Sequence, residues 1–156
     1  MDQSKVRRKL GDRLGDRLGA EEEILLCEPF GLKVSRSSVA ASTAAAFAIG
    51  VGAALVTGGS AVAGVVLPAG WCVVTDQRML VFTKVTGLFR NPFGTALFEA
   101  PVAALTLDGP TGKLNTVTVR DRGEGTELLQ VKSGVSSRRT RALVDAVASV
   151  QQRPPS

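Results

Sequence analysis

Few side chains in this sequence could act as acids, bases or nucleophiles. The chain has 156 residues, with no histidine, no tyrosine and two cysteines. Those cysteines, Cys27 and Cys72, lie in apolar surroundings far apart in the sequence, which predicts buried, unreactive thiols rather than a metal cluster or a disulfide framework. No pair of carboxylates stands out as an acid–base couple. The sequence therefore predicts a protein that is not an enzyme and uses no cofactor or metal.

The most specific motif is Thr75-Asp76-Gln77-Arg78, which joins the apolar runs 71–74 and 79–83. Threonine and aspartate oxygens accept hydrogen bonds from turn amides, so the motif predicts a β-hairpin. We assign Thr75, Asp76 and Arg78 a structural role: the first two satisfy turn amides, and Arg78 anchors the hairpin to a neighbouring acceptor.

Basic residues are the candidates for contact with a partner, since the formal net charge is +5. A moderate positive charge permits contact with anionic lipid or nucleic acid. With aromatic residues at 4% and no basic stretch interleaved with them, we expect no specific nucleic-acid binding. The candidate contacts with an anionic surface are Lys33, Arg36, Arg138, Arg139 and Arg141.

Short apolar runs separated by strong turn signals must position these residues. A first strand is expected near residues 24–30, and turn-forming stretches lie at 91–94, 108–112 and 121–125. The pattern predicts an antiparallel barrel or sandwich. The further strands are expected at 71–74, 79–83, 96–99, 103–107, 116–119 and 127–131, with Trp71, Leu80 and Phe82 in the core.

Two helices are expected at the ends of the chain. Residues 136–151 change to a helical period, with Leu143, Ala146, Val147 and Val150 on one face, which predicts a helix covering one end of the sheet. Residues 1–20 predict an N-terminal amphipathic helix, because apolar side chains recur every four residues. This helix packs against its own domain or lies on a membrane surface. Residues 152–156 are expected to form a disordered tail.

An uncharged stretch rich in alanine and glycine, at residues 38–69, interrupts the expected barrel. If the strands on either side pair, both ends of the stretch lie on one side of any membrane. A helical hairpin of about 14 residues per arm reaches about 21 Å, short of a hydrocarbon core of about 30 Å. The stretch therefore predicts a shallow membrane hairpin, or a segment that packs on the domain or on a second copy. A single span becomes the alternative if residues 20–36 lie outside the barrel.

The stretch from Gly70 to Phe82, a strand followed by Thr-Asp-x-Arg and a second apolar strand, resembles a signature of bacterial pleckstrin-homology-like (PH-like) and GRAM-like domains. This resemblance implies an α+β, mainly β fold, an antiparallel PH-like barrel with a C-terminal capping helix. The PH-like domain would cover residues 21–151, interrupted at 38–69. The resemblance also implies a non-catalytic module that binds lipid surfaces or proteins.

These observations lead to one functional hypothesis and one alternative. The first is a cytoplasmic binding module that attaches peripherally to an anionic membrane surface or serves as a protein-interaction scaffold. A cytoplasmic location follows from the lack of a signal-peptide pattern, since the first long apolar run begins near Val39. The alternative is a membrane-embedded or self-assembling protein that acts through residues 38–69.

Overall fold

Seven antiparallel strands form one sheet in the order β4-β3-β2-β1-β7-β6-β5, and a single long helix follows them. The computed structural model describes residues 8, 12, 14–35, 64–84 and 93–154. In chain order the elements are η1 (Gly15–Arg17), β1 (Ile24–Ser35), β2 (Gly64–Thr75), β3 (Arg78–Lys84), β4 (Phe93–Pro101), η2 (Val102–Ala104), β5 (Leu105–Thr111), β6 (Thr116–Asp121), β7 (Glu127–Lys132) and α4 (Arg138–Gln151).

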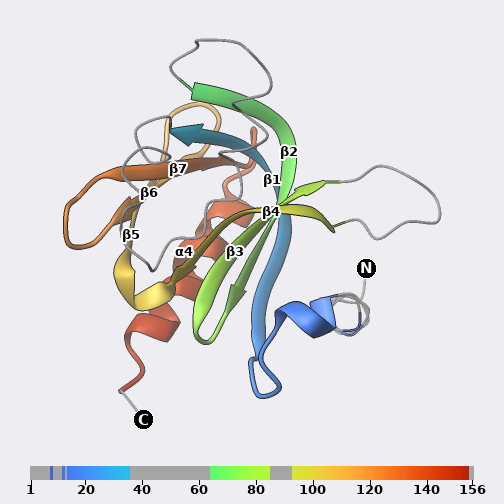
Figure 1. Cartoon of the computed structure of the whole chain (residues 1–156). Coiled ribbons are helices and arrows are strands. Elements are labelled where there is room, and N and C mark those ends of the chain that lie inside the picture. Colours follow the sequence, from blue (N-terminus) through green and yellow to red (C-terminus); the bar gives the residue numbers. More distant parts are fainter. Residues whose placement is uncertain (1–7, 9–11, 13, 36–63, 85–92, 155–156) are drawn as a thin grey trace.

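The long strand β1 joins the two halves of the sheet. It pairs with β2 along its length and, from Gly31 to Val34, also with β7. The ladder with β2 is irregular between Phe30 and Leu32, and such irregularities bend a strand. The sheet curves strongly, so that β2–β4 and β5–β7 enclose a common interior (Figure 1). The pairing of β1 with β2 confirms the expected neighbours on either side of the insertion.

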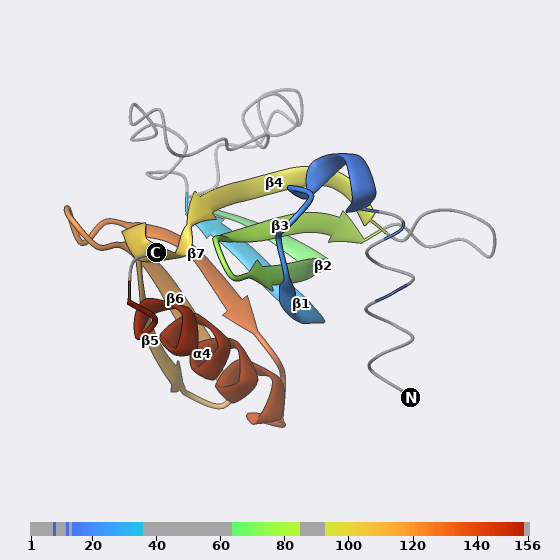
Figure 2. The same ribbon diagram turned by 90° about the horizontal axis from the view of Figure 1, so that it is seen from below.

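The main core fills this interior and is closed by α4. Buried side chains from both halves of the sheet, such as Val81, Phe98 and Leu129, belong to one cluster. From α4, Leu143 and Val147 are buried in the same cluster. Figure 2 shows α4 lying against the β5–β7 half. The expectation of a C-terminal helix that covers the sheet is confirmed.

A second apolar cluster lies on the other face of β2 and β3. Along β3, Met79 and Val81 belong to the main core, whereas Leu80 and Phe82 belong to this outer cluster. Leu14, which precedes η1, is fully buried there. Both faces of β3 are therefore covered, which explains why its sequence is a continuous apolar run rather than an alternating one. Trp71, expected in the core, is only partly buried against the outer cluster.

Several expected boundaries were wrong. Strand β2 begins at Gly64, which pairs with Ser35, so residues 64–69 belong to the strand and not to the insertion. Residues 102–104 form a 3-10 helix where a strand was expected to begin. Strand β5 continues through the expected break at residues 108–111, because a bulge in its ladder with β6 accommodates the extra residues.

The two ends of the chain are described only in part. Most of the helix expected over residues 1–20 lies outside the described residues. In the described part, Leu14 is buried and η1 follows it. Residues 38–63, the remainder of the expected hairpin insertion, also lie outside them. At the expected disordered tail, the amides of Gln152 and Arg153 donate hydrogen bonds to carbonyls of α4.

Candidate functional site

The Thr75–Arg78 motif joins the β2–β3 hairpin to the segment that precedes β1. The Thr75 hydroxyl oxygen accepts hydrogen bonds from the amides of Gln77 (3.2 Å) and Arg78 (3.0 Å) and lies 2.6 Å from Oε1 of Glu22, to which it donates. Asp76 pairs with Glu23 instead: its Oδ1 accepts from the Glu23 amide, and its own amide donates to the Glu23 carbonyl, both at 3.0 Å. The hairpin turn thus holds residues 22 and 23 directly.

Arg78 is the centre of this contact. Its Nε lies 2.9 Å from Oε1 of Glu22 and its Nη2 lies 3.0 Å from Oε2, so the guanidinium binds both carboxylate oxygens. Its remaining donors reach Glu99 on β4 and the carbonyl of Arg17. A planar guanidinium suits such forked recognition, which a lysine could not reproduce. Arg78 therefore connects three segments of the chain.

The Glu22 carboxylate is almost fully enclosed, with its side chain 2% exposed, whereas the Arg78 side chain is 26% exposed. Burial alone would raise the pKa of Glu22, but hydrogen bonds from Arg78, Thr75 and the Gly19 amide outweigh it and lower that pKa. The same ion pair raises the pKa of Arg78, chiefly through its hydrogen bonds to Glu22. Both groups are therefore charged at neutral pH. The sequence predicted an acceptor for Arg78 but did not identify Glu22.

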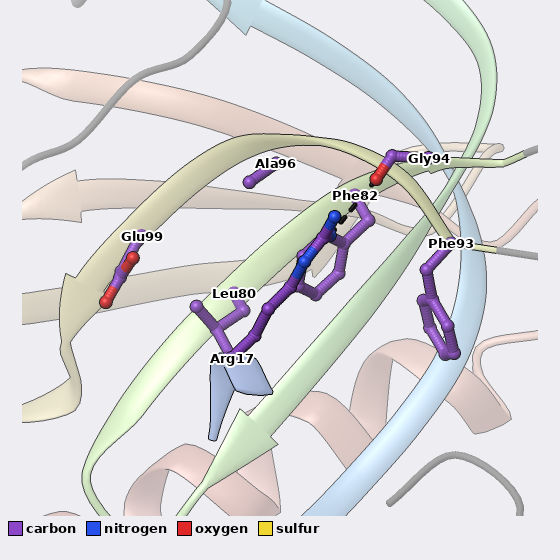
Figure 3. Close-up of a pocket in the computed structure, with 7 residues that line it drawn as sticks. All are labelled: Arg17, Leu80, Phe82, Phe93, Gly94, Ala96 and Glu99. Carbon is purple, nitrogen blue, oxygen red and sulfur yellow. Dashed lines mark hydrogen bonds between the residues drawn. The ribbon is translucent and has the colours of Figure 1, made fainter. Parts of the chain in front are cut away.

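A shallow pocket of about 710 Å³ lies beside this network, on the outer face of β3 and β4 (Figure 3). The Arg17 guanidinium lies over the Phe82 ring, 5.3 Å from its centroid, and donates a hydrogen bond of 3.2 Å to the Gly94 carbonyl. Phe93 packs edge-on against Phe82, with ring centroids 5.6 Å apart. The other lining residues are Leu80, Ala96 and Glu99. The pocket can take a small apolar group, and its one carboxylate already accepts from Arg78.

Near this pocket, the buried indole Nε1 of Trp71 has no hydrogen-bond partner among the described residues. The Trp71 ring lies 5.4 Å from that of Phe93, centroid to centroid. Sequence reasoning missed the pocket, because its walls come from β3, β4 and the segment before β1. The residues of these walls are far apart in the sequence. The one available signal was the continuous apolar run of β3, which indicates a strand covered on both faces.

The two cysteines are free thiols. Burial raises the pKa of Cys27 to about 12, and burial also raises the pKa of Cys72, so both remain protonated at neutral pH. In the described part of the chain, no three histidine, cysteine, aspartate or glutamate residues are grouped so that they could hold a metal ion. Among the same residues, no helix combines the length and the apolar character that a membrane span requires.

The expected anionic-surface residues lie on two elements. Arg138, Arg139 and Arg141 are exposed on the first turn of α4, where Arg139 is 3.6 Å from the Glu28 carboxylate of β1. Lys33 lies in β1, opposite Gln130 of β7, and Arg36 lies outside the described residues.

The β1–β7 pairing also identifies a basic residue that sequence reasoning missed. Gly31 of β1 faces Lys132 of β7, two positions from the pair formed by Lys33 and Gln130. Lys33 and Lys132 are therefore diagonal neighbours on one face of the sheet, a relationship that places side chains roughly 7–8 Å apart. Strand pairing, which the sequence does not specify, creates this proximity.

Comparison with known proteins supports the fold. No family model matches the chain, and no curated protein matches it in sequence. Among solved structures, it is similar to the Ran-binding domain of the nuclear complex component Nup2 from Ashbya gossypii, with a TM-score of 0.50 and 17% identity over 85% of this chain and 97% of that one. That domain has a PH-like fold. The chain is therefore a mainly antiparallel β protein with one C-terminal helix and a PH-like fold.

Proposed function

We propose that this chain is a non-catalytic PH-like binding module that attaches peripherally to anionic membrane surfaces in the cytoplasm. The sequence from Gly70 to Phe82 supports a bacterial, GRAM-like member of the fold. In this proposal Thr75, Asp76 and Arg78 have a structural role, because their described contacts hold the chain before β1 in place. Binding depends instead on basic side chains elsewhere.

The observation that carries the proposal is the position of Arg138 and Arg141. Both side chains are exposed on the first turn of α4, where the positive end of the helix dipole disfavours a cation. Folding stability therefore gains little from arginine at either position. Contact with an anionic surface explains both residues, and we propose the same contact for Lys33 and Lys132, which are diagonal neighbours on the sheet.

The chemistry of the pocket supports a binding role rather than catalysis. Its lining side chains are Arg17, Glu99 and five apolar or glycine residues, and both charged groups are already engaged within the protein. The thiols of Cys27 and Cys72 are held in their protonated, weakly nucleophilic form. A turnover that survives purification and is lost with one point substitution would contradict this part of the proposal.

Vesicle co-sedimentation of the whole chain tests membrane attachment. We expect the protein to pellet with phosphatidylserine-containing vesicles, to stay in solution with pure phosphatidylcholine vesicles, and to dissociate as the salt concentration rises, because screening weakens contacts between exposed charges. Equal binding to both vesicle types, or binding to neither, would contradict the proposal.

A protein partner is the second candidate, favoured by the pocket beside Phe82 and Phe93. Its apolar walls suit a small apolar side chain of a partner. Replacing Ala96 by tryptophan should fill the pocket and remove binding of such a partner. Vesicle binding should be unchanged by this substitution, which separates the two candidates.

The remaining alternative, a membrane-embedded or self-assembling protein acting through residues 38–69, requires a different test. Since Ser35 pairs with Gly64, replacing residues 38–61 with a short Gly/Ser loop should leave the domain folded. A carbonate wash of cell membranes releases a peripheral protein and leaves an embedded one. Full-length protein that resists the wash, while the loop-replaced variant is released, would favour this alternative over ours.

A further inference from the structure

Two loops meet at one end of the domain, the β5–β6 turn and the segment between β7 and α4 (Figure 2). The Gly134 amide donates a hydrogen bond of 3.2 Å to the Leu114 carbonyl. The side-chain amide of Asn115 donates to the carbonyls of Gly134 (2.8 Å) and Val135 (3.0 Å). Asn115 has a φ of 47°, a left-handed conformation that asparagine adopts more readily than most residues. These bonds hold the two loops together.

Each loop presents an aliphatic side chain to solvent. Leu114 is 51% exposed and Val135 is 96% exposed, and they are the large hydrophobic residues that are exposed in the described part of the chain. A single exposed aliphatic residue is ordinary on a protein surface. Here, however, Leu114 and Val135 lie on two neighbouring loops that are joined by hydrogen bonds. We call this pair the Leu114–Val135 tip.

Basic residues flank both loops of the tip in the sequence. Within residues 109–119 and 128–144 the sequence has no aspartate or glutamate. The basic residues in these ranges are Lys113, Lys132, Arg138, Arg139 and Arg141. Two carboxylates come near this group: Glu28 pairs with Arg139, and Asp145 follows Arg141 by one turn of α4. The tip thus combines exposed aliphatic side chains with an excess of positive charge.

We infer that the Leu114–Val135 tip inserts shallowly into an anionic lipid surface while the surrounding lysines and arginines bind the headgroups. The inference rests on the proposed membrane attachment and adds its location and its mode. A bilayer accepts aliphatic side chains without a matching shape and attracts nearby basic groups, which are the two properties that the tip presents. An anionic polymer would bind the basic groups but would leave Leu114 and Val135 in water.

Substitutions that remove only the aliphatic groups test the insertion. Leu114→Ser and Val135→Ser change exposed residues, so we expect the thermal unfolding temperature to stay unchanged. Because burial of one aliphatic side chain contributes substantially to affinity, each substitution should weaken binding to phosphatidylserine-containing vesicles by about tenfold. The matched control is Ala103→Ser, an exposed residue of η2 outside both loops, which should bind as the parent does.

A fluorescent label reports the depth of the tip. Val135→Cys can be labelled selectively with a polarity-sensitive fluorophore, because the pKa of Cys27 is raised to about 12 and Cys72 is buried. With phosphatidylserine-containing vesicles the emission should shift to the blue, as it does in an apolar environment. The control is the same label at Ser149→Cys, an exposed position in the last turns of α4, which should show no shift.

The outcomes separate the inference from the proposed function. If both serine variants bind vesicles as tightly as the parent and the emission of the label at position 135 does not shift, insertion by the tip is overturned. Attachment through charge alone would then remain. Absence of vesicle binding by the parent protein would overturn the proposed function and the inference with it. Weakened binding of both serine variants together with a shift confined to position 135 would support insertion.

Discussion

Arg78 and Glu22, 56 positions apart in the sequence, form a forked ion pair that links the β2–β3 hairpin to the chain before β1. Both carboxylate oxygens of Glu22 accept from the guanidinium, and Thr75 donates to one of them as well. Since the Glu22 side chain is 2% exposed, loss of Arg78 would leave a buried carboxylate with an incomplete set of partners. The pair should therefore matter far more to stability than an ion pair on the surface.

We expect Arg78→Ala to lower the free energy of unfolding by about 2–4 kcal/mol, because it leaves a buried charge without its partner. The matched control is Arg120→Ala, which removes the pair with Asp108 at 2.8 Å, in which both side chains are more than one third exposed. That substitution should cost less than about 1 kcal/mol. Urea denaturation of both variants measures the difference. Equal losses would mean that Arg78 is only a surface contact.

The same pair predicts how stability depends on pH. Because its partners lower the pKa of Glu22 below the ordinary value of 4.5, the unfolded chain takes up a proton at this site before the folded chain does. The contribution of Glu22 to folding stability is therefore complete above pH 4.5. It is lost as the pH falls through the lower pKa that Glu22 has in the folded protein. In thermal unfolding experiments, the gap in unfolding temperature between the parent and Glu22→Gln should narrow on acidification below 4.5. A gap that widens under those conditions would contradict the assigned shift.

Much of the fold was predictable from local sequence, because strands and helices leave periodic patterns. The Thr75–Arg78 motif located the hairpin, and Leu143 and Val147 located the buried face of α4. Glu22 and the pocket beside Phe82 were not predictable, since each depends on segments that only the tertiary fold brings together. The break expected near Pro110 was wrong, because turn-forming residues can be accommodated by a bulge at the edge of a sheet.

The proximity of the basic residues to the tip was unpredictable for the same reason. Arg138, Arg139 and Arg141 were identified as a group because they are adjacent in the sequence. Lys132 lies near Lys33 because β1 pairs with β7. The loop of Leu114 lies beside the loop of Val135 because hydrogen bonds join the two loops. Single-sequence patterns report neighbours along the chain and leave contacts between distant segments unspecified.

Gly70 tests how closely β2 packs against Leu32 and against the backbone of β3. A Cβ added at this position would lie 2.2 Å from Leu32 Cδ1 and 2.7 Å from the Phe82 carbonyl oxygen. Because that oxygen is part of the β3 backbone, relief requires the strands to move, and we expect Gly70→Ala to cost about 1–3 kcal/mol. Gly31→Ala is the control, since its Cβ would meet neighbours at ordinary distances of 3.6–3.7 Å. A fully stable Gly70→Ala variant in urea denaturation would show that the strands are not packed this closely.

The central claim, attachment through the basic end of the domain, is tested most directly by two double variants of equal charge. Arg138→Gln with Arg141→Gln removes two arginines from the first turn of α4, whereas Arg122→Gln with Arg153→Gln removes two exposed arginines elsewhere. Both variants have a net charge of +3, that is +5 minus 2. Each basic residue near the membrane contributes about fivefold in affinity. In titrations with phosphatidylserine-containing vesicles, we therefore expect the Arg138/Arg141 variant to bind at least about tenfold more weakly than the Arg122/Arg153 variant. Equal affinities of the two variants would contradict the account.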